Sequence, residues 1–321
     1  MTRSLAANVV RTAAAILGRA LVLVAFSEFV FLNEIPVSGL IRAENPASGL
    51  LYVISLTALY MLPGALLFAL EPRMRDWATC VLAGALVGWS IEGALVPAMY
   101  EAPPVSYFWT SVSWHAPVDV AFGAAAMPYL MSRAPRPSGL AYVALAALFW
   151  GLWSSWTWPQ MQLSVTEFAM LAAIVTAILG AGYGLIFMTR RETRCGTGLR
   201  RGIVALTVAA ALLWATSAIV PALLVAPIVA ITAVALVLAP RAADRVAPPP
   251  AVGISMVVYL GAFAGVAVAA YAAVARYGAP LNGQDMAALV ALAGAWFWAA
   301  ALVSTMWRKR RARQRARAAD T

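Results

Sequence analysis

Charged residues are scarce in this chain of 321 residues, and histidine, lysine and cysteine are scarcer still. Only 11% of the residues are charged, against about 25% in a typical soluble domain, which excludes a soluble globular protein. The single lysine, Lys309, lies near the C-terminus, so no membrane helix can form the Schiff base of a retinal protein. Cys80 and Cys195 fall near the predicted cytoplasmic surface, where thiols stay reduced, and no disulfide is expected. The sequence has no Walker motif, dinucleotide fingerprint or CxxCH signature, so we expect no nucleotide and no c-type haem.

Long apolar stretches are the dominant feature of the sequence. Hydrophobic residues make up 63% of the chain, and the mean hydropathy is +0.82. A membrane-spanning helix needs about 20 apolar residues, and runs of this length recur along the whole chain. We therefore predict an all-α, polytopic transmembrane helix bundle. Its ten spans are predicted at residues 13–33, 49–70, 78–99, 108–131, 139–157, 167–188, 202–219, 222–239, 252–275 and 286–306.

The net charge of +10 would suggest nucleic-acid binding in a soluble protein, but its distribution indicates a membrane topology instead. If the N-terminus is cytoplasmic, all basic residues except Arg42 and Arg276 fall on the cytoplasmic side of the ten spans. This arrangement obeys the positive-inside rule. It predicts that both termini are cytoplasmic in a bacterial-type inner membrane, and that the partner is the lipid bilayer and not a nucleic acid.

The predicted spans form a single transmembrane domain over residues 1–307. The intramembrane polar groups lie within residues 1–158, which are the expected site-bearing helices, whereas residues 167–307 are almost free of ionisable groups and are the expected scaffold. Residues 308–321 form a basic cytoplasmic tail.

Prolines and glycines predict three local features of this bundle. Pro63 is expected to kink its span. The apolar stretch 202–240 would be nearly twice as long as the ~30 Å membrane core if it were one helix at ~1.5 Å per residue, so two helices meeting near Pro221 are expected. Gly261 and Gly265 have the GxxxG spacing of a helix-packing interface.

The stretch from Trp89 to Gly123 contains the most unusual polar residues of the predicted membrane region. Glu92, His115 and Asp119 lie there among apolar residues, and His115 is the only histidine of the chain. Ionisable groups are costly in hydrocarbon, so their presence indicates a function or a specific internal contact.

Helical spacing places these groups on facing surfaces of two neighbouring helices. Gly84, Gly88 and Glu92 are four residues apart and share one face, where the small glycines allow a close approach of another helix. His115 and Asp119 are also four residues apart on the next span. The outer contacts predicted for this site are Glu28, Glu101, Ser111, Ser90, Tyr100 and Trp114.

Four interpretations of these residues are open. His115, Asp119 and Glu92 could ligate a divalent metal ion, because imidazole and carboxylate groups suit zinc, iron or manganese. The same groups could perform acid–base catalysis without a metal, and Ser90 could pair with His115 as a nucleophile. They could couple proton or cation movement to transport. They could also form hydrogen-bonded helix contacts without any chemistry.

Among these alternatives the sequence favours an intramembrane enzyme. The ionisable groups are confined to the predicted outer half and the midplane of the membrane, and none of them marks a path to the cytoplasm. The expected reaction is a metal- or carboxylate-assisted hydrolysis or transfer on a lipid-like, isoprenoid-like or other small-molecule substrate. A proton- or cation-coupled transporter and a structural subunit of a membrane complex are the alternatives.

Overall fold

Helices are the only regular secondary structure in the part of the chain that the computed structural model describes, residues 2–156, 162–189, 195–239, 253–277 and 283–319. Within these residues, eight helices are long and apolar enough to cross a membrane. They are α1 with its extension η1 (Thr2–Val24 and Ala25–Val30), α5 with η3 (Trp77–Ser90 and Ile91–Leu95), α7 (Pro137–Trp156), α8 (Val165–Thr189), α9 (Thr197–Ala215), α10 (Ile219–Leu238), α11 (Ile254–Tyr277) and α12 (Gly283–Ala319). The protein is therefore a multi-pass helical membrane protein.

A ninth candidate span consists of two helices with a bend between them. Helices α3 (Pro46–Leu59) and α4 (Met61–Leu70) meet at an angle of 47°. Pro63 lacks an amide proton, and its ring crowds the carbonyl group of Leu59, four residues earlier. The predicted kink in this span is confirmed.

The structure does not confirm ten spans. The predicted span 108–131 is helical only from His115 to Met131, as the π-helix η6 (His115–Ala126) followed by α6 (Met127–Met131). At ~1.5 Å per residue this helix is shorter than the ~30 Å membrane core. Residues 108–114 form turns, and within this segment the Ser113 hydroxyl donates to the carbonyl oxygen of Val290 in α12 at 2.7 Å.

The two helices expected around Pro221 are present as α9 and α10, and the chain turns between them at residues 216–218. Pro221 lies in the first turn of α10, where a missing amide proton removes no helical hydrogen bond. The cytoplasmic location of the termini and the division of the chain at residue 158 stay predictions.

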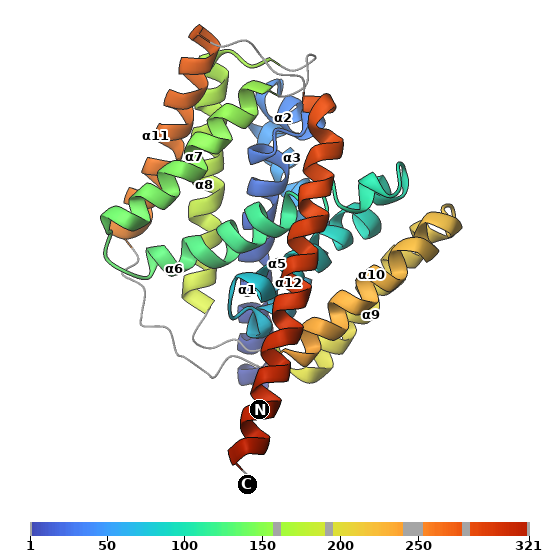
Figure 1. The fold of residues 1–321 in the computed structure, drawn as a ribbon. Helices are drawn as coiled ribbons and strands as arrows, with labels where there is room; N and C mark the ends of the chain where they lie inside the picture. Colours follow the sequence, from blue (N-terminus) through green and yellow to red (C-terminus); the bar gives the residue numbers. More distant parts are fainter. Residues whose placement is uncertain (1, 157–161, 190–194, 240–252, 278–282, 320–321) are drawn as a thin grey trace. The chain divides into compact units, whose positions relative to one another are not determined.

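The helices group into two compact units, and the first consists of residues Met1–Gly64, Ala126–Arg194 and Val246–Met286. Helices α7, α8 and α11 pack side by side in this unit (Figure 1), and α1 packs against α8. The contact between α1 and α8 is close because Gly18 and Gly182 face each other, and a Cβ atom on Gly18 would lie 2.8 Å from the carbonyl oxygen of Gly182.

The expected role of Gly261 and Gly265 in packing is wrong for the described residues. A Cβ atom added at either position meets nothing within 4 Å. Helix α11 uses a different face, on which Ala267 approaches Gly151 of α7 so closely that a Cβ atom at Gly151 would lie 2.4 Å from the Ala267 carbonyl oxygen. The small residues of α11 therefore do pack closely, but not at the GxxxG positions.

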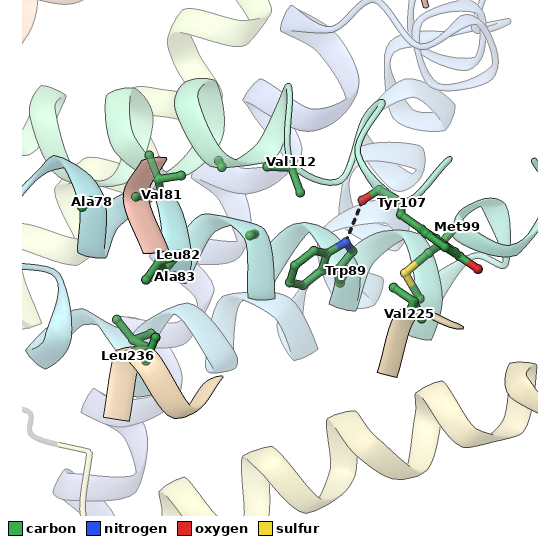
Figure 2. Packing of buried hydrophobic residues seen from close by; sticks show 14 of the residues in the cluster. Ala78, Val81, Leu82, Ala83, Trp89, Met99, Tyr107, Val112, Val225 and Leu236 are labelled. Atoms are coloured by element: carbon green, nitrogen blue, oxygen red, sulfur yellow. Dashed lines mark hydrogen bonds between the residues drawn. The ribbon is translucent and has the colours of Figure 1, made fainter. Parts of the chain in front are cut away.

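The second unit consists of residues Ala65–Ala125, Cys195–Arg245 and Ala287–Thr321. Its apolar core lies around α5 and α10 and includes Val81, Trp89 and Leu236 (Figure 2). The indole group of Trp89 donates a hydrogen bond to the carbonyl oxygen of Tyr107 at 2.8 Å, and the Tyr107 phenol donates to the Pro221 carbonyl oxygen at 2.7 Å. These bonds hold the segment that leads into η6 against both α5 and α10.

Candidate functional site

Glu92, His115 and Asp119 form a continuous row of hydrogen bonds inside the second unit. His115 Nε2 lies 3.1 Å from Glu92 Oε1, and His115 Nδ1 lies 2.7 Å from Asp119 Oδ2. His115 is 2% exposed and Asp119 is 0% exposed, whereas the Glu92 side chain is 12% exposed. The imidazole therefore lies between two carboxyl groups, and only Glu92 gives the row a partial opening to the outside.

Glycines of α5 bring the two sides of this row together. A Cβ atom at Gly84 would lie 2.5 Å from the Cα atom of Ala116, and one at Gly88 would lie 1.9 Å from the carbonyl oxygen of Ser111. Only hydrogen atoms at these two positions let the backbone around His115 approach α5 so closely. The close approach places His115 beside Glu92, at the end of the same helix.

The four ionisable residues predicted inside the membrane all lie on π-helical segments. Glu92 lies on η3, His115 and Asp119 on η6, and Glu28 on η1. A π-helix bonds each amide group to the carbonyl group five residues earlier; such turns are rare and occur frequently at functional sites. Pro117 contributes locally to η6, since it has no amide proton to donate to the regular α-helical ladder.

The two hydrogen bonds of His115 need two protons between three ionisable groups. A carboxylate only accepts hydrogen bonds, and a neutral imidazole donates from one nitrogen, so both bonds form either with imidazolium between two carboxylates or with neutral imidazole and one protonated carboxyl group. Both arrangements carry a net charge of −1 and differ only in the position of one proton.

One atom of the row is not satisfied by the chain. Asp119 Oδ1 is buried and, within the described residues, has no partner in hydrogen-bonding geometry, although the Trp114 side chain lies near this carboxyl group. A buried carboxylate oxygen without a partner is costly, and the cost falls when the group is protonated or contacts a bound water or cation. The far end of the row is therefore suited to gain and lose a proton.

The row does not have the shape of a metal site. Glu92 and Asp119 contact opposite nitrogens of one imidazole ring, so their oxygens do not converge on a common point. In the described part of the chain, no group of three or more His, Cys, Asp or Glu side chains is placed to hold a metal ion. The metal-ligand hypothesis for His115, Asp119 and Glu92 gains no support from this geometry.

The predicted outer contacts fall into different environments. Ser90 donates its hydroxyl to the Val87 carbonyl oxygen at 2.6 Å, so it is not bonded to His115 as a nucleophile would be. Ser111 is buried and bonds to the Ser106 carbonyl oxygen at 3.4 Å, and Glu101 is exposed. The role predicted for these residues, as outer contacts of the site, stays a prediction.

The two aromatic residues of this set lie closer to the row. Trp114 is buried directly before η6, and its side chain lies near the Asp119 carboxyl group. The Tyr100 phenol donates to the carbonyl oxygen of Gly93, the residue after Glu92, at 3.3 Å. Burial raises the pKa of Tyr100 above its ordinary value, so its hydroxyl stays a neutral donor.

Glu28 belongs to a separate polar cluster in the first unit. Tyr60 donates a short hydrogen bond to Glu28 Oε1, Asn33 Nδ2 donates to Glu28 Oε2 at 2.8 Å, and Ser27 Oγ lies 2.7 Å from the Tyr60 hydroxyl. Tyr60, Asn33 and Ser27 were not predicted as partners of Glu28. The spacing of five residues between Glu28 and Asn33 could have indicated this contact, because it fits a π-turn and not the α-helical repeat.

Replacing Tyr60 by phenylalanine is expected to destabilise the protein by about 1–3 kcal/mol, because Glu28 would lose a buried donor. The measurement is the thermal unfolding midpoint of the detergent-solubilised protein. Tyr277→Phe is the matched control, since Tyr277 is 78% exposed and its hydroxyl is not needed for packing. Equal midpoints for the two variants would contradict a buried bond to Glu28.

The fold and the site together define a class: an integral helical membrane protein with a buried acid–histidine–acid row. In comparisons with protein-family models, curated proteins and solved structures, nothing matched this chain. The function must therefore be inferred from the geometry and chemistry of its own residues.

Proposed function

We propose that this protein is a proton-coupled membrane transporter in which Glu92, His115 and Asp119 carry the proton. The observation that supports this function best is the row itself, with a carboxyl group at each nitrogen of one buried imidazole. Proton relays inside membranes are typically built from chains of acidic residues and histidine. The proposed setting is a bacterial-type inner membrane with cytoplasmic termini.

The proton transfers within the row run along its two hydrogen bonds. With imidazolium between two carboxylates, the proton on His115 Nδ1 can move to Asp119 Oδ2 across the 2.7 Å bond, which leaves a neutral imidazole. His115 Nε2–H then still donates to Glu92. After the proton on Asp119 leaves, the proton of the neutral imidazole moves from Nε2 to Nδ1 by tautomer exchange. A new proton that enters at the partly exposed Glu92 then passes to the free Nε2, which restores the imidazolium, so one proton enters for each that departs.

Transport agrees better with the burial of the row than catalysis does. Asp119 is fully buried and His115 nearly so, and both nitrogens of His115 are already engaged by carboxyl groups. A substrate would have to displace one of these bonds before His115 could act as a general base or a ligand. A proton needs no such space, and Asp119 Oδ1 has no competing partner within the described residues.

A pH jump tests the proposal without knowledge of the cargo. Proteoliposomes of the full chain are adsorbed on a solid-supported membrane, and the charge that moves after a rapid pH change is recorded. We expect a transient current for the native protein, because protons bind at a depth inside the membrane field. The current is expected to fall to background in Asp119→Asn.

Glu101→Gln is the matched control for this experiment, since it neutralises an exposed acid between the two helices that carry the row. It should keep the full transient current. Absence of a current in the native protein, or an equal current in native protein and Asp119→Asn, would rule out the proposed proton site. Unfolding midpoints of all three proteins must be similar, so that loss of current is not loss of fold.

A further inference from the structure

A groove lies between α10 and α12 in the second unit, apart from the acid–histidine–acid row. Its volume is about 790 Å³, and its walls are mostly apolar side chains such as Ile231, Val234 and Met306. Lys309 and Arg310 line one end of it. The groove thus combines an apolar floor with a basic end, as an amphiphile with an anionic head would require.

Thr305 supplies a second, independent indication of a ligand. Six threonines in other helices donate their hydroxyl to the carbonyl group four residues earlier: Thr12, Thr57, Thr176, Thr189, Thr207 and Thr232. Thr305 lines the groove and is only 3% exposed, yet its hydroxyl has no hydrogen-bond partner within the described residues. A buried hydroxyl without a partner is costly unless a bound group beside it accepts a hydrogen bond from it.

The positive charge at the end of the groove is not cancelled by nearby acids. Asp76 is already paired with Arg308 at 3.0 Å. Arg73 is also engaged, because it donates to the carbonyl oxygens of Val237 and Ala239 at the C-terminal end of α10. Within the described residues no acidic partner is found for Lys309 or Arg310, so both remain available to an anion.

We propose that this groove binds an anionic phospholipid from the leaflet on the basic, predicted cytoplasmic side. An acyl chain lies against Ile231, Val234 and Met306, and the phosphate group is held by Lys309 and Arg310. Thr305 lies one helical turn before Lys309, about 6 Å deeper along α12. At that depth its hydroxyl donates to an ester carbonyl oxygen of the lipid. Basic pockets between helices on this side of a membrane favour anionic over zwitterionic head groups.

The test compares two lipids with identical acyl chains, phosphatidylglycerol and phosphatidylcholine, which are titrated into the detergent-solubilised full-length protein. Bound lipid is counted by native mass spectrometry. The native protein is expected to bind phosphatidylglycerol more tightly, and Lys309→Gln/Arg310→Gln is expected to weaken this binding by about tenfold or more. Arg200→Gln/Arg201→Gln removes the same charge from α9, outside the groove, and should leave the preference unchanged.

A shape-preserving variant separates the hydroxyl from the charge. Thr305→Val should weaken phosphatidylglycerol binding by about two- to tenfold, the effect of one hydrogen bond. It should not lower the unfolding midpoint in lipid-free detergent, because it removes a hydroxyl that has no partner there. Equal affinity of the native protein for the two lipids would overturn the proposal, as would an unchanged preference in Lys309→Gln/Arg310→Gln. If a neutral lipid or a segment of the chain itself occupied the groove, one of these two contrary results would be observed.

Discussion

Replacing Gly88 by alanine is expected to destabilise the protein by about 3 kcal/mol and to abolish the pH-jump current. A Cβ atom at this position would lie 1.9 Å from the Ser111 carbonyl oxygen and 3.0 Å from the Cβ atom of His115. Overpacking usually costs about 1–3 kcal/mol, and here the obstacle is a backbone carbonyl that cannot rotate away as a side chain can. The backbone around His115 must therefore shift away from α5, which would separate His115 from Glu92.

Gly202→Ala is the matched control for this substitution. Gly202 lies in α9 of the same unit, and a Cβ atom there meets nothing within 4 Å. Alanine favours a helix over glycine by about 1 kcal/mol, so the control should be neutral or slightly stabilising. Unfolding midpoints and pH-jump currents are measured for both variants. If Gly88→Ala matched Gly202→Ala in both measurements, the close approach of α5 to the η6 segment would be contradicted.

Apolar run length predicted most of the fold because the membrane core fixes how long a spanning helix must be. The predicted range 167–188 corresponds to α8, Val165–Thr189, and 252–275 corresponds to α11, Ile254–Tyr277. The range 108–131 failed because hydropathy does not register tertiary anchors: Ser113 donates to the Val290 carbonyl oxygen at 2.7 Å and helps to hold the start of the range in turns. Hydropathy also does not predict which faces of the helices meet.

Glycine spacing illustrates that limit. Gly84 and Gly88 were expected to allow a close helix approach, and they do, whereas Gly261 and Gly265 have the same spacing and face open space within the described residues. The difference lies in the partner surface. Ala116 and the Ser111 backbone approach the first pair, and no side chain or backbone of the described residues approaches the second. Glycine spacing shows where a close helix contact is possible, and tertiary packing determines whether another helix or segment makes that contact.

The pairing of His115 with Asp119 was predictable from helical spacing, whereas the location of Glu28 was not. His115 and Asp119 are four residues apart, and the structure brings them within hydrogen-bonding distance even though η6 is π-helical. The separate environment of Glu28 was not predictable. Its partners Tyr60 and Asn33 depend on the bend between α3 and α4 and on a π-turn, and neither follows from the α-helical repeat.

His115→Leu is expected to lower the free energy of unfolding by about 3–5 kcal/mol, a loss comparable to that of Gly88→Ala. The substitution places an apolar side chain at the position and leaves two largely buried carboxyl groups without their shared partner. Removing one member of a buried ionic group costs this much because the remaining charge stays buried. The midpoint of thermal unfolding in detergent is the measurement, and an unchanged midpoint would contradict the bonds from His115 to Glu92 and Asp119.

A triple variant separates the stability of the row from its function. Glu92→Gln and Asp119→Asn, added to His115→Leu, remove the stranded charges while preserving side-chain size, so most of the lost stability should return. The pH-jump current should not return, because none of the three substituted positions can take up a proton. Recovery of stability without recovery of the current would assign the row to proton binding. A triple variant with native current would show that the current arises elsewhere and would leave Glu92, His115 and Asp119 only a structural role.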